Sequence, residues 1–218
     1  GLFEMTNWAS TLPALLDGIK LTLEVFALTL ALSLPLGVVV ALLRISPWKM
    51  VRLATGGFIW LMRGTPLLLQ LLFIYYFLPT IGIRLDDFPS AIITFVLNYS
   101  AYFAEIFRGG IQSIEPGQYE AARTLGMDYK QTMRRIILPQ MLRRVLPPIT
   151  NETITLVKDT SLIYILAMND LLRVTRSMVQ REFDMTPFLI AGGFYLLFTL
   201  LLTWIFNHLE ERYQVYDR

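Results

Sequence analysis

The chain has 218 residues, of which 55% are hydrophobic and only 17% are charged, and its formal net charge is +2. Soluble domains carry about 25% charged residues, so this composition indicates a membrane protein. The lack of cysteine excludes disulfides and thiol chemistry, and the single histidine, His208, lies among charges near the C-terminal end. Without a histidine–carboxylate set or a cluster of metal-ligating residues, the sequence predicts neither an enzyme nor a metal site.

Long apolar stretches divide the chain into expected membrane spans. A helix needs roughly 20 apolar residues to cross a bilayer. The sequence therefore predicts an all-α membrane protein, a single transmembrane domain over residues 1–218, with five spans at about 18–43, 56–78, 88–110, 147–167 and 187–206. No basic and apolar segment with a small-residue cleavage site opens the chain, so a removable signal peptide is not expected.

The charges of the loops predict how the chain is oriented. The loops at residues 44–55 and 111–146 are strongly basic, whereas those at 79–87 and 168–186 are balanced or acidic. Loops on the cytoplasmic side of a membrane carry the excess of Lys and Arg. We therefore expect the N-terminus outside, the C-terminus in the cytoplasm, and the long loop 111–146 on the cytoplasmic side.

The long basic loop contains a patterned stretch, EPGQYEAARTLGMDYKQTMRRIILP, at residues 115–139. Glu-Ala-Ala at residues 120–122 is followed after three residues by Gly126, and after nine more by Ile136 and Leu138-Pro139. Alanine favours helix, and glycine suits a turn. We expect a short helix, a break at Gly126, and a second basic helix over residues 127–138 that Pro139 kinks or ends.

This spacing resembles the cytoplasmic coupling motif of ATP-binding-cassette (ABC) importer permeases. Three further runs are similar to the polar amino acid subfamily, the type related to histidine, arginine, glutamine and glutamate importers. They are RGTPLLLQ at residues 63–70, AYFAEIFRGGI at 101–111 and VKDTSL at 157–162. The resemblance covers nearly the whole chain and implies a type I ABC importer fold in the bacterial inner membrane.

The resemblance also implies a role for the patterned loop. In that family the helix before the glycine sits in a groove of the ATPase subunit and transmits its movement. The positions that this assigns to ATPase coupling are Glu120, Ala121, Ala122, Leu125 and Gly126. The alternative is an amphipathic surface helix that merely connects two spans.

The partners are implied by the same resemblance. They are two ATPase subunits, a second permease subunit that is identical or a sister chain, an external substrate-binding protein, and the amino acid itself. A nucleic-acid partner is not expected. No GxxxxGK[ST] loop occurs in the chain, so ATP and Mg²⁺ would bind to the partner subunit and no cofactor to this chain.

Polar residues inside the expected spans are candidates for the substrate site. Ionisable groups in a membrane are costly, so a functional role is the first hypothesis for them. Glu152 and Asp159 are seven residues apart, which places them on one face of a helix about 10 Å apart, with Thr155 between them. They would hold a cationic end of an amino acid, and Asn98 and Ser100 would hydrogen-bond its carboxylate.

Other interpretations of these charges remain open. Lys158 would pair with one of the two carboxylates, leaving the other at the membrane interface. Glu105 and Arg108 are one helical turn apart and are expected to form a structural ion pair, and Tyr99 and Tyr102 are expected to pack. An ion-driven secondary amino acid transporter or channel is the alternative function, and a membrane scaffold without a pathway is a third. Which amino acid is carried is left open.

Overall fold

The computed structural model describes residues 8–166, 170–182 and 185–214. Residues 1–7 and 215–218, the last residue of the expected fourth span at 147–167 and four residues of the expected loop at 168–186 lie outside this part. Within it, all regular structure is helical. The elements are α1 (Trp8–Arg44), α2 (Lys49–Gly64), α3 (Leu67–Leu72), η1 (Phe73–Phe77), η2 (Leu78–Ile81), α4 (Asp87–Gln112), α5 (Pro116–Thr124), α6 (Tyr129–Thr132), η3 (Met133–Ile137), α7 (Leu138–Asp159), η4 (Thr160–Leu166), α8 (Leu171–Glu182) and α9 (Thr186–Gln214).

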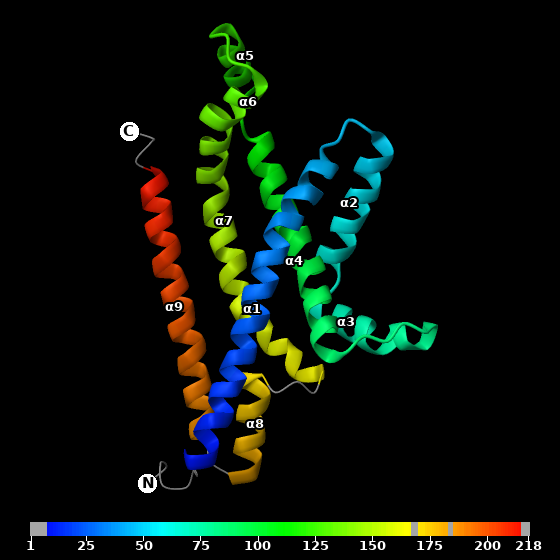
Figure 1. The fold of residues 1–218 in the computed structure, drawn as a ribbon, viewed down its shortest axis with the longest axis vertical. Coiled ribbons are helices and arrows are strands. Elements are labelled where there is room, and N and C mark those ends of the chain that lie inside the picture. The colour runs from blue at the N-terminus through cyan, green and yellow to red at the C-terminus, as the bar shows by residue number, and fades with distance from the viewer. Residues whose placement is uncertain (1–7, 167–169, 183–184, 215–218) are drawn as a thin grey trace.

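Four long helices, α1, α4, α7 and α9, run lengthwise through the molecule (Figure 1). The segment α5–α6 projects beyond them at one end, where the α1–α2 loop and the C-terminal end of α9 also lie. The N-terminal end of α1 and the helix α8 lie toward the opposite end. The two loops that are expected to be cytoplasmic are therefore at the same end of the bundle.

Small residues let these helices approach closely. Gly37 of α1 lies against α4, where an added Cβ would be only 2.8 Å from the Cβ of Phe103. Gly110 of α4 likewise faces Val145 of α7, with no room for a side chain. The aromatic residues Tyr99 and Phe103 are buried in the same core. Close contact through small residues is typical of helices that pack in a membrane.

Three described helices are long and apolar enough to cross a membrane: Thr11–Arg44, Asp87–Gln112 and Thr186–Tyr213. A fourth span arises if α2 and the segment Leu67–Ile81 form one, although these two are bent by 105°. The expected span at 147–167 is not among these helices, because the charged residues along α7 make it too polar. The structure therefore supports three to four spans, fewer than the five expected.

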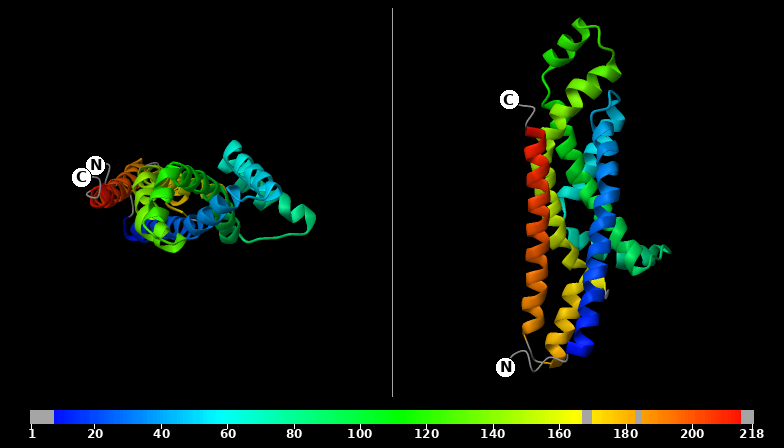
Figure 2. Two further views of the ribbon diagram at one scale, coloured as in Figure 1. Left: turned by 90° about the horizontal axis from the view of Figure 1, so that it is seen from above. Right: turned by 60° about the vertical axis from the view of Figure 1, so that its left-hand side comes forward.

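The segment of the expected second span, at residues 56–78, is not one straight helix. It is interrupted at Thr65 and Pro66, and α3 then extends sideways from the bundle (Figure 2). Proline has no backbone N–H and cannot continue the hydrogen-bond ladder, which explains the break. Much of the expected loop at 44–55 is helical as well, because α2 begins at Lys49.

Two further differences concern α7 and α8. Pro139 does not end the basic helix, because the π-helical turn η3 directly precedes it and the chain continues as α7. A π-bulge is a known way to accommodate an interruption in the ladder. The expected loop at 168–186 contains the helix α8, which packs against α1 and α9.

The helix α8 begins at a buried acidic cap. The carboxylate of Asp170 accepts hydrogen bonds from the backbone N–H groups of Leu172, at 3.2 Å, and Arg173, at 3.3 Å. Burial raises the pKa of Asp170 to about 6, although the two backbone donors oppose this shift. An N-cap residue followed by an amphipathic segment is a helix signal that the interpretation of residues 168–186 as a loop missed.

Candidate functional site

A polar cleft of about 570 Å³ lies where the α2–α3 bend faces α4 and α7. Its lining includes Arg63, Thr65, Asn98, Glu152, Thr155 and Asp159. Four of the five residues expected to bind substrate are therefore brought together from two helices. Pockets for small molecules commonly have volumes of 300–1,000 Å³, so the cleft has the size of such a site.

The bend beside the cleft is fixed by side-chain amides. Pro66 has no N–H to offer to the carbonyl oxygen of Met62, four residues earlier. That oxygen instead accepts hydrogen bonds from Nε2 of Gln70, at 3.0 Å, and Nδ2 of Asn98, at 3.2 Å. Within a membrane a backbone carbonyl must find such a partner. The two amides thus satisfy the group that the proline leaves unpaired.

The same hydrogen bonds decide what Asn98 offers to a ligand. Its Nδ2 also donates to Oε1 of Gln70 at 3.1 Å, so both of its N–H donors are engaged. The free atom is the acceptor Oδ1, which suits an ammonium group rather than a carboxylate. Ser100 is not among the residues that line the cleft, since it is fully buried and its hydroxyl donates to the carbonyl of Leu97 at 2.8 Å.

Hydrogen-bond acceptors form the wall that α7 contributes. Oδ2 of Asp159 accepts a hydrogen bond of 2.6 Å from the hydroxyl of Tyr99. The hydroxyl of Thr155, which lines the cleft, donates to the carbonyl of Asn151 at 2.9 Å, so its oxygen remains as an acceptor. Among the described residues neither Glu152 nor Asp159 forms a salt bridge. The acidic face predicted from the seven-residue spacing is therefore present, and its two carboxylates are not held in close ion pairs within the described part of the chain.

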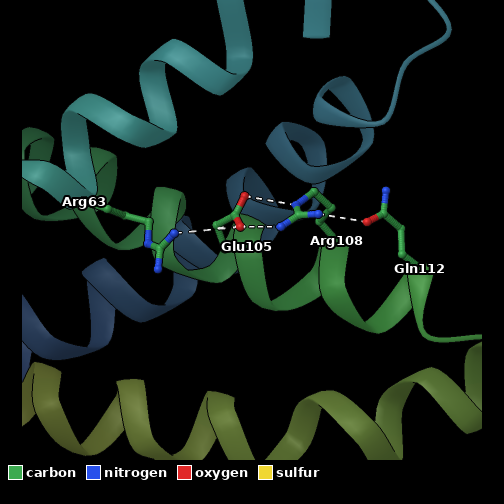
Figure 3. Close-up of polar contacts among 4 residues, drawn as sticks. All are labelled: Arg63, Glu105, Arg108 and Gln112. Atoms are coloured by element: carbon green, nitrogen blue, oxygen red, sulfur yellow. Dashed lines mark hydrogen bonds and ion pairs between the residues drawn. The ribbon is translucent and has the colours of Figure 1, made fainter. Parts of the chain in front are cut away.

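Arg63, Glu105 and Arg108 form a cluster of charges (Figure 3), and Arg63 also lines the cleft. Glu105 and Arg108 form the expected ion pair, with Arg108 Nη2 2.6 Å from Oε2 and Nε 3.1 Å from Oε1. Arg108 Nη1 also donates to Oε1 of Gln112 at 2.8 Å. Arg63, which lines the cleft, reaches Oε2 of Glu105 at 3.8 Å. These contacts connect the cleft to the end of α4.

A second groove, of about 290 Å³, lies on the other side of the bend. It is lined by apolar residues such as Leu61, Phe73 and Leu97, and no charged side chain contributes to it. Of these two hollows, the polar cleft is the one with the charged groups expected of an amino acid site.

The second candidate region is the elbow, residues 116–132, at the projecting end of the molecule. Helix α5 ends in a Schellman motif: Met127 N–H donates to the carbonyl of Ala122, and Gly126 N–H to that of Arg123. Gly126 has φ +79°, the left-handed conformation that favours glycine. The predicted short helix and its break at Gly126 are confirmed.

The next helix is also fixed locally. The side chain of Asp128 accepts from Gln131 N–H at 2.8 Å, and the Gln131 side chain accepts from Asp128 N–H at 3.1 Å. This capping box sets the direction of the chain into α6. Gln140 donates to Gln118 at 3.2 Å and ties α5 to α7. The elbow is therefore a defined unit.

The tip of the elbow exposes apolar side chains. Leu125 is 77% exposed and Tyr129 is 76% exposed, whereas Ala122 is fully buried. Glu120, Ala121 and Gly126 lie on the same short segment around this tip. Burial raises the pKa of Tyr119, and its neighbour Tyr129 raises it further. The exposed Leu125 and Tyr129 are therefore candidates for contact with another protein.

Sequence reasoning missed Arg63 and Tyr99 as parts of the cleft, and Gln70 as a support of the bend beside it. Tyr99 packs in the core as expected, but it also holds Asp159 from 60 positions away. The role of Gln70 had a signal, because Pro66 leaves a carbonyl unpaired and an amide follows it four residues later. For Tyr99 no signal of this kind exists, since the contact depends on how α4 packs on α7.

The folded chain has the architecture of a helical membrane permease. A solved structure described as an amino acid ABC transporter with histidines is 33% identical, with a TM-score of 0.85, and the match covers 94% of this chain and 96% of that chain. A MetNI methionine ABC transporter is 15% identical with a TM-score of 0.70, covering 93% and 95%, and shows the fold alone.

Residues 33–215 match the family described as the binding-protein-dependent transport system inner membrane component, and the chain belongs to this family. It is thus a multi-pass inner-membrane permease subunit of an ABC importer and is not itself catalytic. A binding-protein-dependent system implies an ATPase and a binding protein as partners.

Curated relatives cover the chain almost completely. The arginine transport system permease protein ArtQ of Bacillus subtilis (strain 168) is 34% identical over 94% of this chain and 95% of its own length. The glutamine transport system permease protein GlnP of Escherichia coli (strain K12) is 36% identical over 96% and 98%. The L-cystine transport system permease protein TcyB of Bacillus subtilis (strain 168) is 36% identical over 99% and 91%.

Proposed function

We propose that this permease subunit carries a polar amino acid through the membrane and binds it in the polar cleft during passage. The observation that carries the proposal is the set of hydrogen-bond acceptors that α4 and α7 present to the cleft. Glu152, Thr155, Asp159 and Oδ1 of Asn98 all accept hydrogen bonds, and the α-ammonium group of an amino acid donates three. The relatives named for arginine, glutamine and cystine transport support this class of substrate.

The charges of the cleft favour a basic amino acid. Two carboxylates, Glu152 and Asp159, and one cation, Arg63, line it. A neutral zwitterion brings one charge of each sign and leaves one carboxylate without a partner. A ligand with an additional cation at its side chain neutralises both carboxylates, which matters because unpaired charge in a low-dielectric environment is costly.

The proposed topology has five spans in a single transmembrane domain, with the N-terminus outside and the C-terminus in the cytoplasm. The α7–η4 segment then crosses the membrane within the bundle, its charges facing the cleft rather than lipid. The presence of the elbow, the α1–α2 loop and the end of α9 at one end of the molecule supports this orientation. So does the basic character of the two loops.

The proposed assembly contains two permease subunits, identical or sister chains, two ATPase subunits that bind ATP and Mg²⁺, and an external binding protein. The exposed Leu125 and the helix α5 fit a docking role toward the ATPase, with Glu120, Ala121, Ala122 and Gly126 shaping the contact. ATP would close the ATPase pair, carry the elbow with it, and expose the cleft alternately to the two sides. The nucleotide must favour one arrangement by differential contacts.

The test is uptake into proteoliposomes that contain the complete complex. We expect labelled basic amino acid to accumulate only when binding protein is present on the external side and ATP on the side of the ATPase. Accumulation driven by a proton or sodium gradient without ATP would instead support the ion-driven alternative. Absence of any amino acid uptake with a competent ATPase would overturn the proposed substrate class.

A further inference from the structure

We propose that Arg63 binds the carboxylate of the transported amino acid and that Glu105 is the positioning residue that holds its guanidinium at the edge of the cleft. This inference rests on the proposed function, because it concerns the same cleft. It adds a recognition site for the α-carboxylate, which is bonded to the same carbon atom as the α-ammonium group. The expected carboxylate partners Asn98 and Ser100 have no free donors for that carboxylate.

The placement of Arg63 suits this role. It stands in the last turn of α2, directly before the bend, and is the one arginine or lysine that lines the described cleft. Its guanidinium carbon lies 5.5 Å from the centre of the Tyr102 ring, which also lines the cleft. A cation over an aromatic face is attracted to it and oriented by it. The ring thus supports one side of the guanidinium and leaves its edge free.

The contact between Arg63 and Glu105 is loose, whereas that between Arg108 and Glu105 is tight. Arg108 takes both oxygens of Glu105, at 2.6 and 3.1 Å, and Arg63 Nη1 remains at 3.8 Å from Oε2 (Figure 3). In the described part of the chain, Arg63 donates no hydrogen bond within 3.5 Å, and its side chain is 46% exposed. Its planar set of N–H donors is therefore available, and such a set matches a carboxylate with two parallel hydrogen bonds.

The charges of the cluster leave a surplus at Arg63. The tight pair of Glu105 and Arg108 is neutral as a unit, so the third member contributes a net positive charge next to the cleft. Glu105 still attracts Arg63 and restricts the movement of its side chain while the cleft is empty. An incoming carboxylate meets the cation without net repulsion from Glu105, since Arg108 already balances that residue.

The arrangement matches both charged groups at the α-carbon of an amino acid. Acceptors of α4 and α7 line the cleft, and the cation lies at its α2 edge. An amine of the same shape without a carboxylate would use only the acceptors and would leave Arg63 unused. Discrimination between an amino acid and its decarboxylated analogue is therefore the property that Arg63 and Glu105 control.

The experiment compares L-arginine with agmatine, the amine that lacks its carboxylate, as ligands of the purified complex in nanodiscs without binding protein. Arg63→Gln is expected to weaken arginine binding about 10–100-fold, the cost of losing a charge-assisted pair. Agmatine binding should stay within about twofold. Glu105→Gln should weaken arginine binding about 3–10-fold and leave agmatine binding unaffected. When it is added to Arg63→Gln, it should not change the ratio of arginine affinity to agmatine affinity any further.

A matched control removes a carboxylate elsewhere. Glu24 pairs with Lys20 at 3.9 Å on the surface of α1, and Glu24→Gln should leave both ligands unchanged. If Arg63→Gln does not assemble, Arg63→Lys keeps the charge without the planar fork, and a selective loss of arginine binding alone again supports the proposal. Equal losses for arginine and agmatine in the Arg63 and Glu105 variants would show a purely structural role.

The outcome also separates the two proposals. If Asp159→Asn weakens both ligands while Arg63→Gln changes neither, the cleft is the binding site and the carboxylate assignment is overturned. If Asp159→Asn and Arg63→Gln both leave arginine binding unchanged, or if the wild-type complex binds none, the cleft is not the amino acid site and the proposed function fails there with it.

Discussion

The elbow and the cleft differ in how the sequence builds them. The turn of the elbow is held by hydrogen bonds between residues at most five positions apart, such as Met127 to Ala122 and the capping box of Asp128. The cleft depends on contacts that join residues 28 to 60 positions apart, from Asn98–Gln70 to Tyr99–Asp159. A local element tolerates changes elsewhere, so coupling and substrate recognition should be separable by mutation.

The largest effect is expected in the elbow, from Gly126→Pro. Proline fixes φ near −65°, which is incompatible with the φ of +79° at this position. The Schellman motif would be lost and α5 misplaced, so ATP-driven uptake should fall more than about tenfold while the ATPase continues to hydrolyse ATP. Glu120→Lys should likewise reduce uptake without stopping ATP hydrolysis. Both are measured as the ratio of amino acid transported to ATP hydrolysed in proteoliposomes.

The control for this experiment lies in α5, the helix that Gly126→Pro is expected to misplace. A Cβ added at Gly117 would have open space around it, with no atom of another element within 4 Å, so Gly117→Ala should leave the ratio of transport to hydrolysis unchanged. Arginine binding to the complex without binding protein should remain normal in the elbow variants. Coupled uptake at the wild-type level in Gly126→Pro and Glu120→Lys would contradict the docking role.

In the cleft, Asp159→Asn is expected to give the next largest effect. It removes one of the two carboxylates that a dibasic ligand neutralises, so uptake of a basic amino acid should fall about tenfold. Uptake of a neutral amino acid should fall less, because that ligand carries one cation and retains Glu152. The rate of ATP hydrolysis by the ATPase subunits should be preserved, because the elbow is unchanged. Equal losses for the two substrates would indicate that Asp159 has only a structural role.

A smaller effect is expected from Tyr99→Phe. The phenylalanine keeps the buried ring but removes the 2.6 Å hydrogen bond to Asp159, leaving the carboxylate free to turn away. A single hydrogen bond contributes about 0.5–1.5 kcal/mol, so affinity for a basic amino acid should change about 2–10-fold. Tyr102→Phe, which retains the ring beneath Arg63, is the matched control. If the two variants bind the basic amino acid with identical affinity, Tyr99 contributes to packing only and its hydroxyl does not support substrate binding.

The difference between the two regions also explains what could be predicted from the sequence. The helix, turn and break around Gly126 follow from residue preferences within one short stretch, and they are confirmed. The shared face of Glu152 and Asp159 follows from helical periodicity. The roles of Asn98, Gln70 and Tyr99 depend on which helices become neighbours after the break at Pro66, and periodicity in one segment does not contain that information.

A region that belongs to neither the elbow nor the cleft provides the last test. Asp170 caps α8 at the opposite end of the molecule, and its pKa of about 6 lies above the ordinary 3.8 because it is buried. The folded state therefore binds this proton more tightly than the unfolded state. Its contribution to stability is complete below about pH 4 and is lost as the pH rises through about 6.

Asp170→Asn keeps an acceptor for the cap and removes the charge. Thermal unfolding in detergent should show the variant unfolding a few degrees higher than wild type near pH 8, with the difference vanishing near pH 4, while transport and coupling stay unchanged. A difference in unfolding temperature that does not vary with pH would mean that the cap, and not the buried charge, dominates at Asp170.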